Sequence, residues 1–313
     1  MADVSDQILG DSQIPLDLSV LIVTFNSAET IVACIKSVVA EIDTLQAEII
    51  VVDNNSADRT PMILKDLAAA HKNIKLVLSP HNRGFAIGNN QALEKSTGEQ
   101  VLILNPDTII HKGTLAGLLS ALKKDDKVAI TAPKMQFPDG RTQKTCRRFP
   151  RHLDVIYNSF GLAQLFPKNQ HFNAWKMGDF DHESTRQVDQ PAGAALMIRG
   201  TVLRELQGFD PNFPMFFNDV DLCKRVKDAG HEIWFISDLV MDHVGGASVK
   251  QAKVKMTLSS HVSFFRYFEK HFTRVHQQPL NFLVGVLLYT TLIPRLILLA
   301  FQGGSKTRSG DTL

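Results

Sequence analysis

Short apolar runs alternate with helical patterns along the first 125 residues, and this alternation restricts the possible folds more than any other feature. The runs cover residues 18–25, 48–52, 74–78 and 101–104. Each is rich in aliphatic residues and is followed by turn-forming residues, as expected of strands that are buried on both faces. Strands and helices in this order predict an α/β domain with a mostly parallel, Rossmann-like sheet, right-handed crossovers and helices on both faces.

Composition sets broad limits on the class of protein. A chain of 313 residues with 44% hydrophobic and 21% charged residues can form one large domain with an appendage. Its net charge of +2 argues against nucleic-acid binding. Cys34, Cys146 and Cys223 lack metal-ligand spacing, so a reduced, cytoplasmic chain is the simplest account. Residues 1–17 contain no segment of signal-peptide type, and we expect them to be flexible.

Polar and acidic residues follow the apolar runs. They are Thr24 and Asn26, then Asp53 and Asn55, then Asn105 and Asp107. The carboxyl ends of parallel strands meet at one edge of a sheet, where open α/β sheets bind ligands. Carboxylate and amide oxygens suit Mg²⁺ or Mn²⁺ that carries a diphosphate. The alternative is that each aspartate only caps the helix after it. No Gly-x-Gly-x-x-Gly or P-loop is present, which argues against a dinucleotide-binding domain.

Several longer motifs follow one another between residues 18 and 250. They read VLIVTFNSAETIVACIKSV, IIVVDNNSADRT, NRGFAIGNNQAL, VLILNPDT, PAGAALMIRG, GFDPNFPMFFNDVDLCKRVKDAG and HVGGAS. In this order they resemble the inverting family 2 glycosyltransferases with the GT-A fold, most closely the branch that contains bacterial rhamnosyltransferases of surface-polysaccharide assembly. The resemblance implies a GT-A domain over residues 18–252, with a donor-binding half at about 18–135 and an acceptor half at about 136–252.

The resemblance also implies roles for single residues. The implied substrate-binding residues are Thr24, Asn26, Asp53, Asn55, Asn82, Arg83, Gly84, Asn105, Gly193 and Ala194. Asn105-x-Asp107 matches the DxD motif, in which Asp107 would bind the metal. His243 would contact the metal or the diphosphate, the alternative being an ordinary surface or core histidine. Arg83 either contacts a phosphate or is solvated.

Inversion requires a general base for the acceptor hydroxyl. The family places it in a Glu-Asp pair that aligns with Asn218-Asp219, so Asp219 is the predicted base and Asp221 the fallback. Asparagine in place of glutamate removes a like charge, which should lower the pKa of Asp219 and weaken it as a base. This departure keeps a second function open, namely a nucleotide-sugar-binding or scaffolding protein that has lost its chemistry. A third alternative, a nucleotidyltransferase, usually has a Gly-rich basic loop in this N-terminal region, and residues 24–27 (TFNS) do not form one.

A basic segment begins the predicted acceptor half. Arg141, Lys144, Arg147, Arg148 and Arg151 lie within eleven residues, with His152 beside them. A run of charges is usually a solvated face. Next to a membrane-binding tail it could instead hold a polyprenyl diphosphate or an anionic lipid. Trp175, further on, either stacks on an acceptor sugar or fills local core.

The C-terminal segment, 253–302, is predicted to form an amphipathic helix followed by an apolar one. Residues 280–301 carry a single charge, Arg295, and are long enough to span a bilayer. Pro294 and Arg295 divide this stretch, and an arginine at depth costs several kcal/mol, which favours a kinked helix in the interface. Lys306 and Arg308, in the flexible tail 303–313, would favour the inner leaflet. The alternative is a core helix pair, packed on the catalytic domain or in a homodimer.

Together these patterns predict an inverting glycosyltransferase that uses Mg²⁺ or Mn²⁺. It would move a sugar, rhamnose by resemblance, from a dTDP-, UDP- or GDP-sugar to a lipid-linked or polysaccharide acceptor in cell-surface glycan synthesis. We expect it to lie at the cytoplasmic, inner face of the plasma membrane as a peripheral or monotopic protein.

Overall fold

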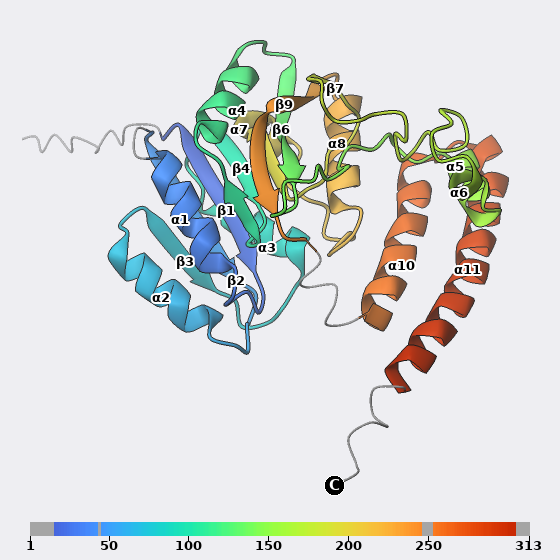
Figure 1. Ribbon diagram of the computed structural model, residues 1–313, viewed down its shortest axis with the longest axis horizontal. Coiled ribbons are helices and arrows are strands. Elements are labelled where there is room, and N and C mark those ends of the chain that lie inside the picture. Colours follow the sequence, from blue (N-terminus) through green and yellow to red (C-terminus); the bar gives the residue numbers. More distant parts are fainter. Residues whose placement is uncertain (1–15, 43–44, 246–252, 305–313) are drawn as a thin grey trace, which may run out of the picture.

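The computed structural model describes residues 16–42, 45–245 and 253–304 (Figure 1). Most of the two ends predicted to be flexible, 1–17 and 303–313, lies outside these residues, as do Lys306, Arg308 and the last part of the HVGGAS loop.

Four parallel strands form the first half of the sheet, in the order β3-β2-β1-β4. They are β1 (Leu18–Thr24), β2 (Ala47–Asp53), β3 (Ile74–Leu78) and β4 (Gln100–Leu104). The connecting helices are α1 (Ile31–Ile42), α2 (Thr60–Ala70) and α3 (Phe85–Glu94). All residues of β1 and β4 are buried, which explains why these runs lack polar alternation. The strand and helix predictions for this half are confirmed.

The second half of the sheet is mixed, and the order continues β4-β8-β6-β9-β5. Its elements are β5 (Thr108–Ile110), α4 (Thr114–Lys123), β6 (Val128–Gln136), β7 (Arg186–Gln187), β8 (Ala195–Arg199), α7 (Gly200–Glu205), α8 (Asn218–Asp228) and β9 (Glu232–His243). β8 is antiparallel to both β4 and β6, whereas β6 and β9 are parallel. β6 and β9 pair with each other as far as Gln136 and Asp242.

Helices cover both faces of the sheet, as predicted. Alternate side chains of β1 point to opposite faces: Val20 and Ile22 contact one core, and Leu21 and Val23 the other. The first core includes residues of α1, α2 and α4, and the second includes residues of α3, α7 and α8.

A group of helices lies to one side of the sheet, at the right of Figure 1. It consists of α5 (His152–Ser159), α6 (Leu162–Leu165), α10 (Lys253–His271), the 3-10 helix η1 (Val275–Gln277) and α11 (Gln278–Gly304). A third core holds the group to the domain through Phe213 and Val220 on one side and Tyr267, Phe268 and Val284 on the other. α11 continues through Pro294, so the predicted division of the apolar stretch is not observed.

His152, at the start of α5, belongs to this packing and not to a solvated basic face. Its side chain is 9% exposed, and Nε2 lies 2.8 Å from Asn281 Oδ1 of α11. The ring also contacts Phe268 and Phe272. His152 therefore helps to join α5 to the α10–α11 pair.

Asp221 connects α8 to α10 through a buried ion network. The side chain is 0% exposed, and its oxygens lie 2.8 Å from Arg225 Nε, 2.6 Å from Lys270 Nζ and 2.9 Å from His271 Nε2. Burial alone would raise the pKa of Asp221, but these partners outweigh it and the pKa is lowered. Asp221, the fallback base, is thus committed to structure.

Replacing Asp221 with asparagine should destabilise the protein by about 3 kcal/mol, because buried cations lose their counter-charge. Urea unfolding of the full chain in detergent measures this loss. The network's contribution to stability is fully present above the pKa of Asp221 in the unfolded chain, about 3.9. It is lost as pH falls through the lowered pKa of Asp221 in the folded protein.

Asp228→Asn is the matched control on the same helix. Asp228 pairs with Lys224 but its side chain is 55% exposed, so its loss should cost no more than about 0.5 kcal/mol. Equal effects of the two variants would contradict the role given to Asp221.

Candidate active site

Neighbouring strands bring the predicted site residues to one rim of the sheet. In the strand register Thr24 is opposite Asp53, and Leu104 is opposite Ala195. Because β8 is antiparallel, its first residues lie where β2, β1 and β4 end, and the Asn105 amide donates to the Ala194 carbonyl at 2.9 Å. Adjacent strands are about 4.8 Å apart, so this rim extends about 14 Å from β2 to β8.

At the β2 end of the rim, Asp53 shapes a tight turn. Its side chain is 2% exposed and accepts hydrogen bonds from Ser56 Oγ at 2.6 Å and Ser56 N at 3.0 Å. The Asn26 amide donates to Ser56 Oγ at 2.8 Å, which ties the β1 loop to the β2 loop. Asn26 and Asn55 have φ of 51° and 63°, a region in which asparagine is well tolerated. The buried Thr24 hydroxyl has no hydrogen-bond partner within the described ranges.

The loop at residues 82–84 closes against the later half of the chain. Asn82 and Arg83 are exposed, and Asn82 Oδ1 accepts a hydrogen bond from the Gly84 amide at 3.0 Å. Gly84 has φ of 87°, and a Cβ there would lie 2.6 Å from the Pro214 carbonyl oxygen. Asn54 Nδ2 donates to the Gly84 carbonyl at 3.0 Å. Only glycine fits this position without strain.

Asp107 and His243 lie side by side where β5 begins and β9 ends. His243 Nε2 lies 3.5 Å from Asp107 Oδ1, and the Gly245 amide donates to Asp107 Oδ2 at 3.1 Å. His243 Nδ1 lies 3.0 Å from Gln143 Oε1, which can accept a hydrogen bond from the ring and fix its orientation. Burial alone would raise the pKa of Asp107, but the bonds from His243 and Gly245 outweigh it, and the pKa is lowered.

These two residues fit a divalent cation that is only partly held by protein. No cluster of three or more His, Cys, Asp or Glu side chains with metal-binding geometry occurs in the described part of the chain. Mg²⁺-type ions usually bind one or two protein carboxylates and take their other ligands from phosphate and water. A lowered carboxyl pKa and a histidine oriented by a neighbouring amide suit that arrangement.

Asp219 lies at the β8 end of the rim, in the first turn of α8. Its Oδ2 accepts from the Gly193 amide at 2.9 Å and from Gln190 Nε2 at 3.2 Å, and its Oδ1 accepts from the Val220 amide at 2.9 Å. Burial raises the pKa of Asp219 by more than these bonds lower it. The expected lowering from loss of the neighbouring carboxylate is therefore outweighed by burial.

Asn218, where the resemblance implies a glutamate, is buried at 4% exposure and donates Nδ2 to the Met215 carbonyl at 2.9 Å. The residue supports the loop before α8.

A cavity of about 410 Å³ is lined by residues that contact Asp107 and Asp219, although neither aspartate lines it itself. Its lining includes His243, which contacts Asp107, and Gln190, which contacts Asp219. A second hollow of about 620 Å³, between α4 and β9, includes none of the rim residues.

Gln143, Gln190 and Ser56 are contacts that the sequence analysis did not identify. Each fixes a predicted site residue, namely His243, Asp219 and Asp53 respectively. Gln190 directly precedes the PAGA motif, and that adjacency is the one available signal. The other two lie in loops without a periodic pattern.

Comparison with known proteins gives a family match and several relatives. The family model described as "Glycosyl transferase family 2" matches residues 19–185. The low-salt glycan biosynthesis hexosyltransferase Agl10 of Haloferax volcanii is 24% identical over 280 residues, which is 86% of this chain and 82% of that protein. The N-acetylglucosaminyl-diphospho-decaprenol L-rhamnosyltransferase of Mycobacterium tuberculosis is 24% identical over 58% of this chain and 61% of its own.

Solved structures show the same fold. A Pyrobaculum calidifontis mannosyltransferase, PcManGT, in complex with GDP-Man and Mn²⁺ has a TM-score of 0.57 at 18% identity, over 96% of this chain and 77% of its own. GalNAc-T7 with UDP, GalNAc and Mn²⁺ also has a TM-score of 0.57, at 17% identity, over 73% and 43%. The predicted GT-A type fold is confirmed.

Gly84→Ala should reduce the free energy of unfolding by about 2 kcal/mol or more, because an alanine Cβ would overlap the Pro214 carbonyl and keep a strained φ. Thermal or urea unfolding measures the change. Gly140→Ala is the control: Gly140 has a similar φ of 83°, but a Cβ there meets nothing within 4 Å. It should cost only about 1 kcal/mol, the strain of the backbone alone. Equal losses would show that the Pro214 contact is unimportant.

Proposed function

The chain belongs to glycosyl transferase family 2 and is a glycosyltransferase, and we propose that it is an inverting, metal-dependent enzyme of cell-surface glycan synthesis. It moves a sugar from a dTDP-, UDP- or GDP-sugar to a lipid-linked or polysaccharide acceptor. The donor occupies the half at about 18–135, and the acceptor the half at about 136–252. The name of the Haloferax relative supports glycan synthesis, and that of the Mycobacterium relative supports rhamnose and a diphospho-lipid acceptor.

One observation carries the proposal. The Asp107–His243 pair and Asp219 lie at the same rim, and a single cavity joins their partners His243 and Gln190. A sugar between the two centres would have its leaving diphosphate on one side and the attacking hydroxyl on the other. That opposition is what a single inverting displacement requires.

On the donor side, Asp107 and His243 would hold Mg²⁺ or Mn²⁺. When bound, the cation supplies charge neutralisation for the departing diphosphate. Thr24, Asn26, Asp53 and Asn55 surround the nucleoside, and the exposed Arg83 contacts a phosphate.

On the acceptor side, Asp219 accepts the proton of the acceptor hydroxyl. The hydroxyl oxygen attacks the anomeric carbon of the donor sugar, and the bond between that carbon and the diphosphate breaks. The Gly193 amide and Gln190 orient the carboxylate. A raised pKa makes Asp219 a better proton acceptor near neutral pH than an ordinary aspartate.

Activity should therefore fall as pH drops through the raised pKa of Asp219, which lies above the usual Asp pKa of about 3.9.

The second candidate is a nucleotide-sugar-binding protein without chemistry. Asn218 is the observation that favours it, because the family's glutamate is absent there. Both candidates bind the donor, and only the enzyme turns it over.

We further propose that α11 holds the protein at the inner face of the membrane. The stretch Val275–Leu296 is long and apolar enough to cross a bilayer, and only 22% of its most apolar window is buried in the structure. Several large apolar side chains are exposed on or beside it: Phe160, Leu165, Phe166, Phe282, Leu283, Val286, Tyr289 and Ile293. A core helix pair would bury such residues, so the packing favours lipid or a second copy as the covering surface.

A hydrolysis and transfer screen over dTDP-, UDP- and GDP-sugars tests the enzyme. Turnover should require Mn²⁺ or Mg²⁺ and stop with EDTA. Asp219→Asn should lower kcat about 10³-fold, as loss of a general base does, and leave the nucleotide Kd within about twofold.

Asp228→Asn, on the exposed part of the same helix, should retain wild-type turnover. Wild-type protein that binds a nucleotide sugar but never turns it over would favour the binding protein. Full activity of Asp219→Asn would exclude Asp219 as the base.

Membrane attachment is tested by flotation with vesicles of phosphatidylethanolamine and phosphatidylglycerol. The variant Phe282→Glu with Tyr289→Glu changes side chains that are 74% and 64% exposed, so the packed face of α11 stays intact. Its bound fraction should fall at least about tenfold, because apolar burial is lost.

Met62→Glu, on α2, is the control, since Met62 is also exposed, at 57%, and should not affect binding. A variant that still floats but changes from dimer to monomer would identify this face as an interface between two copies.

A further inference from the structure

The basic residues that are adjacent in sequence have different surroundings. Arg141 pairs with Asp139 at 2.9 Å, and Arg151 pairs with Asp154 at 3.0 Å. Arg148 is exposed. The remaining two, Lys144 and Arg147, line the 410 Å³ cavity beside His243 and Gln190.

Arg147 is a partly buried cation that lacks a counter-ion. Within the described ranges no carboxylate lies within ion-pair distance of it, and its Nη1 donates only to the carbonyls of Lys144 and Cys146, at 2.7 and 2.8 Å. Burial lowers the pKa of the guanidinium. An unpaired cation in a partly desolvated place is costly, and an anionic ligand would offset that cost.

The backbone fixes Arg147 next to the proposed base. Its amide donates to the Gln190 carbonyl at 2.7 Å, and the Gln190 amide donates back at 3.1 Å. Gln190 Nε2 in turn holds Asp219. The Arg147 guanidinium therefore lies on the acceptor side, whereas Asn26 and Asp53 lie at the other end of the rim.

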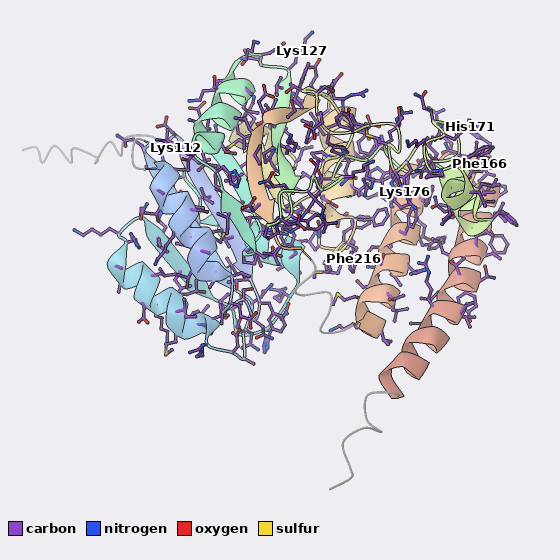
Figure 2. The ribbon with its side chains drawn as sticks, in the orientation of Figure 1. Lys112, Lys127, Phe166, His171, Lys176 and Phe216 are labelled. Carbon is purple, nitrogen blue, oxygen red and sulfur yellow. The ribbon has the colours of Figure 1, made fainter. Side chains whose placement is uncertain are left out.

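Further positive charge continues from the cavity toward α11. The pKa of Lys176 is lowered, first by burial and then by the charges of Arg147 and Arg295. Figure 2 labels Lys176 near α10, and its neighbour Trp175 packs on Phe264 of that helix. Arg295, the single charge in the apolar part of α11, thus contributes to the same positive field. The cavity also includes Thr145, whose buried hydroxyl has no partner among the described residues.

We propose that Lys144, Thr145 and Arg147 form a subsite for the phosphates of the acceptor, and that the acceptor is a prenyl diphosphate-linked sugar. The inference rests on the proposed function and names its acceptor class. A guanidinium fork and a hydroxyl match diphosphate oxygens, and charge-assisted bonds of this kind are strong. The prenyl chain extends past Lys176 toward the apolar α10–α11 pair, and the sugar hydroxyl reaches Asp219.

Calorimetry of the full chain in detergent tests the subsite, with farnesyl diphosphate as the probe and farnesol as its uncharged counterpart. EDTA is present, so binding through a metal at Asp107 does not contribute. Wild type should bind farnesyl diphosphate at least about tenfold more tightly than farnesol. Arg147→Gln should raise the Kd for farnesyl diphosphate at least about tenfold, and Lys144→Gln should raise it about threefold.

Arg148→Gln is the matched control, because Arg148 is the exposed neighbour outside the cavity. The Kd of this variant for farnesyl diphosphate should differ from the wild-type value by less than twofold. Equal losses in Arg147→Gln and Arg148→Gln would reduce the effect to general surface charge and overturn the subsite. So would a loss of nucleotide-sugar affinity in Arg147→Gln, measured with Mn²⁺, because the cavity would then hold the donor.

The same preparations separate this inference from the proposed function. A wild-type protein that hydrolyses a nucleotide sugar but does not distinguish farnesyl diphosphate from farnesol overturns the subsite alone. A wild-type protein that binds farnesyl diphosphate more tightly than farnesol but never turns over a nucleotide sugar would overturn the proposed enzymatic function and leave the subsite standing.

Discussion

The reversed direction of β8 is the constraint on which the site depends. Had β8 been parallel to β4, its first residues would lie at the opposite edge of the sheet, and Gly193 and Ala194 would be far from Asn105. Because the strand is antiparallel, the Asn105 amide reaches the Ala194 carbonyl at 2.9 Å, and the Gly193 amide reaches Asp219 at 2.9 Å. Two hydrogen bonds thus connect the predicted metal side to the predicted base side.

Two carboxylates on this rim have pKa values displaced in opposite directions. Both are partly withdrawn from water, which by itself raises a carboxyl pKa. Asp107 faces an imidazole and an amide that overcome this effect, so its pKa is lowered, whereas the neutral donors around Asp219 do not. A carboxylate that stays ionised suits a cation, and one with a raised pKa suits proton transfer. The environments therefore support the roles that we propose from the family resemblance.

The parts that could be predicted from sequence are those in which one local pattern determines the structure. β1 and β4 are buried along their whole length, and their apolar runs give their ends to within a residue or two. The three-residue β5 and the last residues of β6 and β9 depend on pairing between distant segments, which no local pattern reveals. The same holds for Gln143 and Gln190: an amide in a loop has no periodic signal, and its function is apparent only when His243 or Asp219 is beside it.

The helix that carries the predicted base is also the helix that fixes the C-terminal pair. Asp219 begins α8, and Asp221, two residues later, points away from the rim into the cations of α10. Val220, between them, packs in the third core with Tyr267 and Phe268. One helical turn thus holds the carboxylate at the rim and joins it to the α10–α11 pair. This pair has exposed apolar surface, so under the proposed membrane attachment the distance between the membrane and Asp219 would be set by this packing. An enzyme that draws its acceptor from a lipid chain needs that distance to be constant.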